Sequence, residues 1–391
     1  MNRFSTLPAE YRTLCLALRN RDAAHEAALE SAMDEIGDWS GFLSAAVNNH
    51  VVPLLAHGLG RKHMARMPTE VRDKLEGWRD RQSRKCLSQT AELIRLTGLF
   101  AKEGIRVLAV KGVALSQLLH GNLARRGFGD MDLLVDPAQM WKAHDLVLAA
   151  GYGNGGAKLP LLWQRSDAQP FIRDLPYRHS DGHLLELHQR LTDDPDFFPL
   201  DFETLWADRQ EIPGWGGSVH TMSQRHLALY LCVHGAAHGW QRLCWLVDMA
   251  TLLQSPEIAA LALSDAEAME LRQPMVDVLC LCDVLLGARP VPGILCDIRG
   301  QAWVVRYCRW FIENGAWAES CPDRSLAWYR REIRLRWYRY RAKGRWRSVW
   351  SQFRADISYP VDWSLFRLPR GLRGLYPFLR PLGFLIRWIK G

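Results

Sequence analysis

The chain has 391 residues, of which 48% are hydrophobic, and a formal net charge of +8 at pH 7. This length allows a sizeable buried core and predicts two or three structural units. No uninterrupted apolar run approaches the roughly 20 residues that a membrane span needs, and residues 1–16 lack the apolar stretch of a signal peptide. The nine cysteines include no C-x-x-C pair. We therefore expect a cytoplasmic protein with reduced, buried thiols.

The first 103 residues read as a helical region. Amphipathic periodicity runs through residues 39–59 and again through residues 71–100. Residues 104–212 contain the predicted strands, and residues 213–391 return to helical periodicity. The connector that begins this last region, Pro213 to Gly217 (PGWGG), is rich in turn-forming residues.

A strand, a glycine turn and a helix are predicted at the start of the central region. Residues 106–110 (RVLAV) form a short apolar run typical of a buried strand, and residues 114–119 follow as a helix. Gly112 lies at the junction, where the first amides of a helix are unpaired and its dipole is positive. This turn suits a triphosphate, with Lys111 beside it as a point charge.

Two carboxylates follow on the next predicted strand. A basic loop containing Arg125, Arg126 and Gly129 leads into residues 130–135 (DMDLLV). Asp130 and Asp132 share one face of that strand because side chains alternate with period two. Two acids on one face repel each other unless a cation lies between them. A D-x-D pair alone is commonly a solvated loop, but the flanking glycine turn and apolar run favour a metal site for phosphate chemistry.

A further acid lies on residues 183–191 (HLLELHQRL), which read as another strand. Leu184, Glu186 and His188 share one face of it. A glutamate on an apolar strand is costly without a partner. A metal cluster shared with the two aspartates would supply that partner.

Two histidines and an aspartate follow in the helical region. His234 and His238 are one helical turn apart, and Asp248 lies further along the same apolar segment. Tryptophans around them favour a packed core with structural histidines. Lining of a cleft, together with His188, is the alternative for these residues.

The C-terminal part is the basic one. Residues 303–391 contain 19 Lys and Arg against 6 Asp and Glu. Residues 328–350 interleave aromatic residues with arginines, which suits either RNA binding or an amphipathic helix with solvated arginines. Residues 376–389 suit either a membrane surface or a terminal packing helix.

These elements resemble the uncharacterised nucleotidyltransferase family of the DNA polymerase β-like nucleotidyltransferase superfamily. The resemblance rests on an ordered set of motifs. They are Val110-Lys111-Gly112, Arg126, Gly129-Asp130-Met131-Asp132-Leu133-Leu134-Val135, Gly151-Tyr152, residues 183–191, the paired-histidine helix of residues 234–248, and residues 368–369 with 376–381.

The resemblance implies an α+β protein with a polymerase-β-like catalytic core of small mixed sheet and flanking helices, framed by helical regions. It implies transfer of a nucleoside monophosphate from an NTP, with ATP expected, to an unidentified small-molecule, protein or RNA acceptor. Asp130, Asp132 and Glu186 would hold two Mg²⁺ ions, or Mn²⁺ in their place, with Glu186 as general base.

One position departs from the superfamily pattern. The phosphate turn usually reads Gly-Ser or Gly-Gly, whereas this chain has Lys111-Gly112-Val113 without a hydroxyl. We expect Lys111, or the pair Arg125 and Arg126, to neutralise the phosphates instead. The missing serine leaves open a nucleotide-binding or scaffold protein without turnover. The basic C-terminal region leaves open an RNA-modifying enzyme that uses this region to hold RNA.

Overall fold

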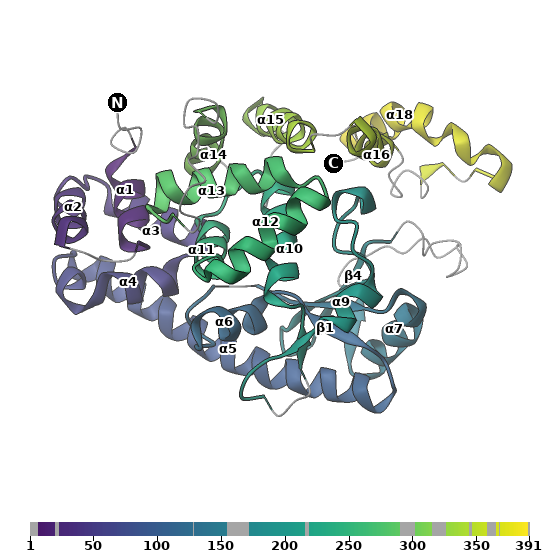
Figure 1. Ribbon diagram of the computed structural model, residues 1–391, viewed down its shortest axis with the longest axis horizontal. Coiled ribbons are helices and arrows are strands. Elements are labelled where there is room, and N and C mark those ends of the chain that lie inside the picture. The colour runs from purple at the N-terminus through teal and green to yellow at the C-terminus, as the bar shows by residue number, and fades with distance from the viewer. Residues whose placement is uncertain are drawn as a thin grey trace.

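The computed structural model describes residues 7–19, 23–127, 129–154, 172–215, 219–289, 302–314, 326–343, 346–357, 365–366 and 368–389. These residues form an α+β fold in which helices surround a small mixed sheet (Figure 1). The fold class predicted from the sequence is therefore confirmed.

The sheet has five strands in the spatial order β1-β2-β5-β4-β3. Their bounds are Val107–Ala109 (β1), Met131–Val135 (β2), Tyr152–Asn154 (β3), Asp174–His179 (β4) and Leu184–His188 (β5). Strands β2 and β5 pair in parallel, and all other neighbours are antiparallel. The predicted strands at 106–110, 130–135 and 183–191 are thus β1, β2 and β5, each slightly shorter than predicted.

The two faces of the sheet pack against different helices. Leu133 and Val135 of β2 join a core with the 34-residue helix α5 (Thr69–Lys102) and with α7 (Met140–Ala149). Leu134 points the other way, into a second core built by the N-terminal and C-terminal helices. Asp132 shares the face of Leu134. The alternation of β2 therefore directs this carboxylate toward the C-terminal helices.

Four short helices precede α5, and the periodic stretch of residues 39–59 is divided between the last two of them. They are α1 (Ala9–Ala17), α2 (Ala23–Asp34), α3 (Trp39–Asn48) and α4 (Val52–Met64). Asp38 caps α3 by accepting a hydrogen bond from the amide of Gly41 at 2.9 Å. Pro53 occupies the first turn of α4, where no amide donor is needed.

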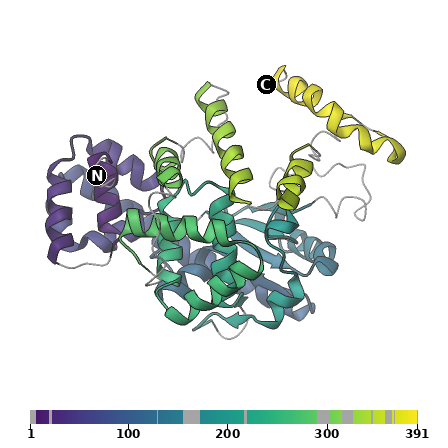
Figure 2. The same cartoon turned by 45° about the horizontal axis from the view of Figure 1, so that its top comes forward.

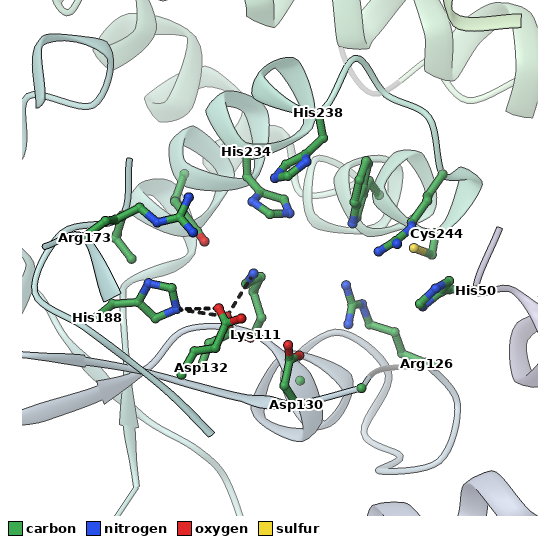
Figure 3. A pocket seen from close by; sticks show the side chains of 18 residues that line it. His50, Lys111, Arg126, Asp130, Asp132, Arg173, His188, His234, His238 and Cys244 are labelled. Carbon is green, nitrogen blue, oxygen red and sulfur yellow. Dashed lines mark hydrogen bonds and ion pairs between the residues drawn. The ribbon is translucent and has the colours of Figure 1, made fainter. Parts of the chain in front are cut away.

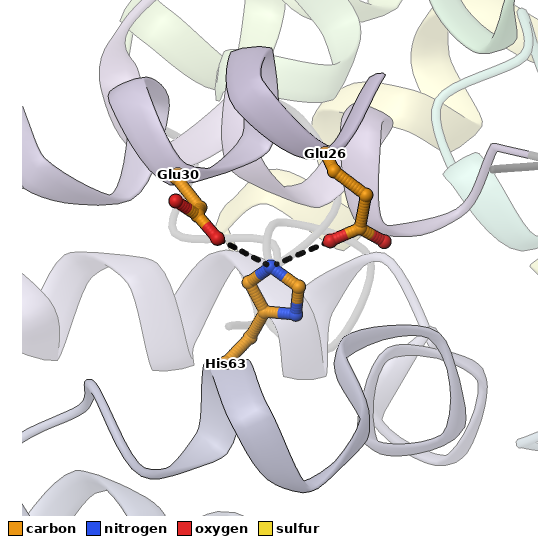
Figure 4. A group of neighbouring side chains, drawn as sticks. All are labelled: Glu26, Glu30 and His63. Atoms are coloured by element: carbon orange, nitrogen blue, oxygen red, sulfur yellow. Dashed lines mark ion pairs between the residues drawn. The ribbon is translucent and has the colours of Figure 1, made fainter. Parts of the chain in front are cut away.

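A cluster of charged side chains joins α2 to α4 (Figure 4). His63 Nε2 lies 3.1 Å from Glu26 Oε2 and 3.9 Å from Glu30 Oε1. Lys62 also contacts Glu30, and Arg66 Nη1 lies 3.5 Å from it. Because two permanent cations already neutralise Glu30, we interpret the cluster as an ion-pair brace between the two helices.

A hairpin and a helical bundle follow the sheet. The hairpin pairs β6 (Gln210–Glu211) with β7 (His220–Thr221), and its turn contains the predicted connector, of which Gly216 and Gly217 lie outside the described residues. Two short 3₁₀ helices, η1 (Pro137–Gln139) and η3 (Pro195–Phe197), and the helix α9 (Phe202–Ala207) lie between the larger elements. The bundle consists of α10 (Gln224–Ala237), α11 (Leu243–Leu252), α12 (Pro256–Ala268) and α13 (Arg272–Leu286).

The segment 234–248, predicted as one helix, is two helices with a break between them. Gly239 and Trp240 have φ angles of 64° and 52°, so the chain leaves the helical path after α10. The Trp240 ring folds back over Gly235, where an added Cβ would lie 2.1 Å from the ring. Packing of this buried tryptophan therefore ends α10 and starts α11 in a new direction.

The basic C-terminal part is helical in the described ranges. It contains α14 (Ala302–Asn314), α15 (Leu326–Ala342), α16 (Trp346–Ile357), η5 (Arg370–Leu375) and α18 (Tyr376–Ile389). Helix α15 is anchored to the bundle by Leu335 and Tyr338, both buried. Helices α16 and α18 lie at the periphery, away from the bundle, in both views (Figures 1 and 2).

Seven cysteines lie in the described part of the chain, and all are buried free thiols. None of the helices seen there is, on its own, long and apolar enough to cross a membrane. Helices α11 and α12 meet the criterion together by length and composition, with a bend of 110° between them.

Candidate active site

Three carboxylates meet where β2 and β5 begin. Asp132 and Glu186 are direct partners in the parallel pair, so their side chains leave the same face of the sheet. Asp130 is the residue just before β2, two positions from Asp132. All three line a cavity of about 420 Å³ between the sheet and the helices α10 and α11 (Figure 3). The structure therefore brings together the three acids that the sequence nominates.

Asp132 is buried between two cationic side chains. Its Oδ1 atom lies 3.0 Å from Lys111 Nζ and accepts a hydrogen bond from His188 Nε2 at 3.2 Å. His188 Nε2 also lies 3.3 Å from Glu186 Oε2. Burial opposes ionisation, but Lys111 and His188 outweigh it and hold the pKa of Asp132 well below its usual range. Asp132 is therefore an anion held in a fixed position.

His188 and Lys111 carry the matching positive charges. Burial lowers the pKa of His188, but its hydrogen bonds to Asp132 and Glu186 dominate and raise the value to about 9. Burial likewise opposes the charge of Lys111, and the nearby Asp132 and Asp130 carboxylates raise its pKa above the usual range. Both side chains are therefore protonated near pH 7.

Asp130 lacks comparable compensation. Burial and the charge of Asp132 together raise its pKa to about 6, although Lys111 opposes the change. A carboxyl group with this pKa lies in a region short of positive charge. A cation bound between Asp130 and Asp132 would return it to the ionised form.

Gly112 forms part of the cavity wall beside the three carboxylates. It is the first residue of α6 (Gly112–His120) and has a φ of 65°. A Cβ at this position would lie 3.1 Å from the carbonyl oxygen of Asp130. Glycine thus permits both the turn and the close approach of the loop before β2. Gly112 and Lys111 both line the cavity, at the end of α6 where unpaired amides favour anions.

Helices α10 and α11 supply an aromatic wall across the cavity. Tyr230, His234 and His238 follow at four-residue intervals along α10 and its C-cap, and all three line the cavity. The rings of His234 and His238 are 4.7 Å apart, and each lies within 5.4 Å of the Trp245 ring. Burial, together with Lys111 and other nearby cations, lowers the pKa of both histidines well below 6.5. They are therefore neutral.

The two arginines of the basic loop take different directions. Arg126 lines the cavity, and its Nε atom donates to both carboxylate oxygens of Asp248 at 2.8 and 2.9 Å. Asp248 is fully buried, does not line the cavity, and ties the loop to α11. Arg125 lines two other cavities instead. Gly129 lies in the same cavity wall as Arg126.

Eight further residues line the cavity and were not predicted: His50, Gly127, Arg173, Leu191, Tyr230, Arg242, Cys244 and Trp245. Arg173 lies beside His188 at one end of the cavity, whereas His50 and Cys244 lie beside Arg126 at the other (Figure 3). Tyr230 continues the four-residue spacing of His234 and His238, a signal that was available in the sequence. His50 lies between α3 and α4, where no pattern marks it.

The chain matches the model of one protein family, described as uncharacterised nucleotidyltransferase, over residues 36–287. A comparison with curated proteins and one with solved structures gave no match. The matched span includes the sheet, the three carboxylates, Lys111 and the histidines of α10. The chain belongs to this family of nucleotidyltransferases.

Proposed function

We propose that the protein transfers a nucleoside monophosphate from an NTP to an acceptor nucleophile and releases pyrophosphate, using two divalent ions. One observation carries the proposal. Asp130, Asp132 and Glu186 converge on a single cavity whose edge holds the N-terminus of α6 and Lys111. Carboxylates beside an anion site form the arrangement needed for metal-assisted phosphate chemistry.

The donor set fits Mg²⁺. Three carboxylates supply oxygen ligands, and a 420 Å³ cavity leaves space for substrate phosphates to supply others. Mn²⁺ takes the same oxygen ligands and would fit the three carboxylates in place of Mg²⁺, with His188 beside them as a hydrogen-bond donor. When bound, the ions would neutralise charge on the phosphates and align the attacking and leaving oxygens.

The protein's own side chains have separate roles in the reaction. Glu186 accepts the proton of the acceptor hydroxyl as that oxygen bonds to the α-phosphorus. The bond from the α-phosphorus to the oxygen that bridges to the β-phosphate breaks, and pyrophosphate leaves with the electron pair. His188 positions Asp132 and Glu186 through its contacts with both. Lys111, which contacts Asp132 in the structure, would contact the phosphates when that carboxylate holds a metal ion.

Other parts of the cavity would bind the rest of the substrates. The neutral rings of His234 and His238, with Trp245, offer a surface on which a nucleobase can stack. ATP is the nucleotide we would test first. The acceptor would enter near Arg126 and His50, at the end of the cavity away from Arg173 (Figure 3).

Calorimetric titration with each NTP, with and without Mg²⁺, tests the proposal. Wild type should bind at least one NTP in a Mg²⁺-dependent manner, and the Asp130→Asn/Asp132→Asn variant should lose that binding more than tenfold. The matched control is Asp73→Asn/Asp80→Asn, which removes two exposed aspartates of α5 and should bind as wild type does.

Retained Mg²⁺-dependent binding in Asp130→Asn/Asp132→Asn would contradict the metal assignment. Absence of NTP binding by wild type would favour the scaffold alternative, in which the fold no longer turns over nucleotide. A nucleotide that binds identifies the substrate for an acceptor search, scored by pyrophosphate release in wild type and in Glu186→Gln.

A further inference from the structure

Exposed apolar side chains are concentrated in one part of the molecule. Among the described residues, fourteen large hydrophobic side chains are exposed, and ten of them lie between positions 333 and 385. The family match ends at residue 287, so this surface belongs to a C-terminal extension of the matched region. Scattered exposed apolar residues are ordinary, whereas a concentrated group marks an interaction surface.

Helix α18 presents its apolar stripe to solvent. Phe378, Leu382 and Leu385 follow at i, i+4 and i+7 and are 79%, 47% and 47% exposed. The opposite face is the anchored one. Tyr376 on that face is buried, and its hydroxyl donates to the Phe366 carbonyl oxygen at 2.7 Å. A surface helix of a globular protein normally turns its apolar face toward the core, whereas α18 turns its apolar face toward solvent.

Helix α16 repeats the arrangement. Trp346, Trp350 and Phe353 have the same i, i+4, i+7 spacing and are 73%, 47% and 41% exposed. Their rings are stacked along the helix, with centroids 5.7 and 5.4 Å apart. Ser351, on the other side, donates a hydrogen bond to Asp194 Oδ1 at 2.6 Å. Helix α16 is thus held to the body by a polar contact, and α18 is held by the segment just before it. Both neighbouring helices turn aromatic or aliphatic stripes outward.

The charge of residues 365–391 indicates which kind of partner binds the exposed apolar surface. Residues 365–391 contain six Arg and Lys and neither Asp nor Glu. A second copy would bring the same positive charge and be repelled. Single-stranded RNA matches the charge, but Leu382 and Leu385 are aliphatic and offer no ring for a base to stack on. A bilayer with anionic headgroups matches both the cations and the apolar stripes.

We propose that α16 and α18 dock the protein on the surface of an anionic membrane. Helix α18 has 14 residues, fewer than the roughly 20 required to span the hydrocarbon layer, so it lies in the interface. Its apolar stripe enters the boundary between headgroups and acyl chains, and the net positive charge of residues 365–391 attracts the segment to lipid phosphates. The peripheral position of both helices leaves the bundle clear of the membrane (Figures 1 and 2).

Sedimentation of the full-length protein with vesicles tests this inference. The vesicles contain either phosphatidylcholine alone or equal parts of phosphatidylcholine and phosphatidylglycerol. Wild type should bind the anionic vesicles at least tenfold more tightly than the neutral ones. Phe378→Ser/Leu382→Ser/Leu385→Ser should lose most of this binding, and the exposed positions of these side chains should leave the melting temperature unchanged.

The matched control is Leu87→Ser/Leu148→Ser/Leu261→Ser, which removes three exposed apolar side chains from α5, α7 and α12. It should bind anionic vesicles as wild type does. Equal vesicle binding by the α18 variant and wild type would overturn the proposal, as would absence of binding by wild type. Binding of a single-stranded RNA oligonucleotide but not of vesicles would assign the surface to RNA. Conversion of a wild-type oligomer to a monomer by the α18 substitutions, without vesicle binding, would assign it to contacts between copies.

Discussion

Gly112 combines two constraints that a single added methyl group would violate. Its φ of 65° is costly for other residues, and its Cβ position lies 3.1 Å from the Asp130 carbonyl oxygen. Gly121, at the other end of the same helix, has a φ of 59° but no atom near its Cβ position. A comparison of the two positions therefore distinguishes the cost of a positive φ from the cost of a Cβ placed close to the Asp130 carbonyl oxygen.

Substitution of each glycine by alanine should give different results. Both Gly112→Ala and Gly121→Ala should lower the free energy of unfolding by about 1 kcal/mol because of the positive φ. Gly112→Ala should also displace Asp130 and weaken Mg²⁺-dependent NTP binding several-fold, whereas Gly121→Ala should leave it unchanged. Urea denaturation and calorimetry on both variants measure the two effects. Equal NTP affinity in both variants would count against a role for the close approach.

The loop that carries Arg126 is tied to α11 by a buried ion pair. Arg126 and Asp248 are both almost completely buried, and the Arg126 guanidinium opposes the rise that burial causes in the pKa of Asp248. Breaking such a pair leaves a charge in a low-dielectric interior, which is far costlier than breaking a pair on the surface. The pair thus connects the loop before β2 to the helical bundle.

Removal of one partner should show that cost. Asp248→Ala should lower the free energy of unfolding by about 3–5 kcal/mol, as measured by urea denaturation. Asp283→Ala, which breaks a pair with the exposed Arg289, should cost less than about 1 kcal/mol. The Arg126→Met/Asp248→Ala variant should be more stable than Asp248→Ala alone, since no unpaired charge remains. A loss below about 1 kcal/mol for Asp248→Ala would show that water reaches Arg126.

At the scale of elements, the sequence predicted some features better than others. Strands β1, β2 and β5 were predicted because each is a short apolar run bounded by turn residues. The break between α10 and α11 was missed because it depends on Trp240, whose indole nitrogen donates to Tyr338 at 3.0 Å, 98 positions away. The cavity residues His50 and Arg173 were missed for a similar reason. Each is a single polar residue in a connection, and only the tertiary fold places it in the cavity wall.

The C-terminal helices are joined to the bundle by a buried polar chain. Tyr338 of α15 accepts the hydrogen bond from Trp240 and donates one to Asp277 Oδ2 of α13 at 3.3 Å. Gln273 donates to the other carboxylate oxygen at 2.7 Å. Burial raises the pKa of Asp277 from 3.8 to about 7, despite these hydrogen bonds. The folded protein therefore holds a proton on Asp277 at a pH where the unfolded chain has lost it.

This proton makes the stability of the whole molecule depend on pH. Between about pH 4 and pH 7 the folded state binds more protons at Asp277 than the unfolded state, so this residue lowers stability as pH rises through that window. Asp277→Asn removes the contribution. The variant should gain up to about 2–3 kcal/mol of stability relative to wild type on going from pH 5 to pH 8, because each pH unit inside the window contributes about 1.4 kcal/mol. Urea denaturation at both pH values measures the gain, with Asp283→Asn as control, and a difference that is constant with pH would contradict the assignment.

The contact between Lys111 and Asp132 has a consequence for the order of substrate binding. Without substrate, this carboxylate is already neutralised from within the protein, so a divalent ion must compete with an internal ammonium group for it. A triphosphate that attracts Lys111 removes the competitor. Linkage then requires each ligand to tighten the other by the same factor. We expect weak occupancy by free magnesium and cooperative loading of magnesium with nucleotide, which would keep the site from assembling until its substrate arrives.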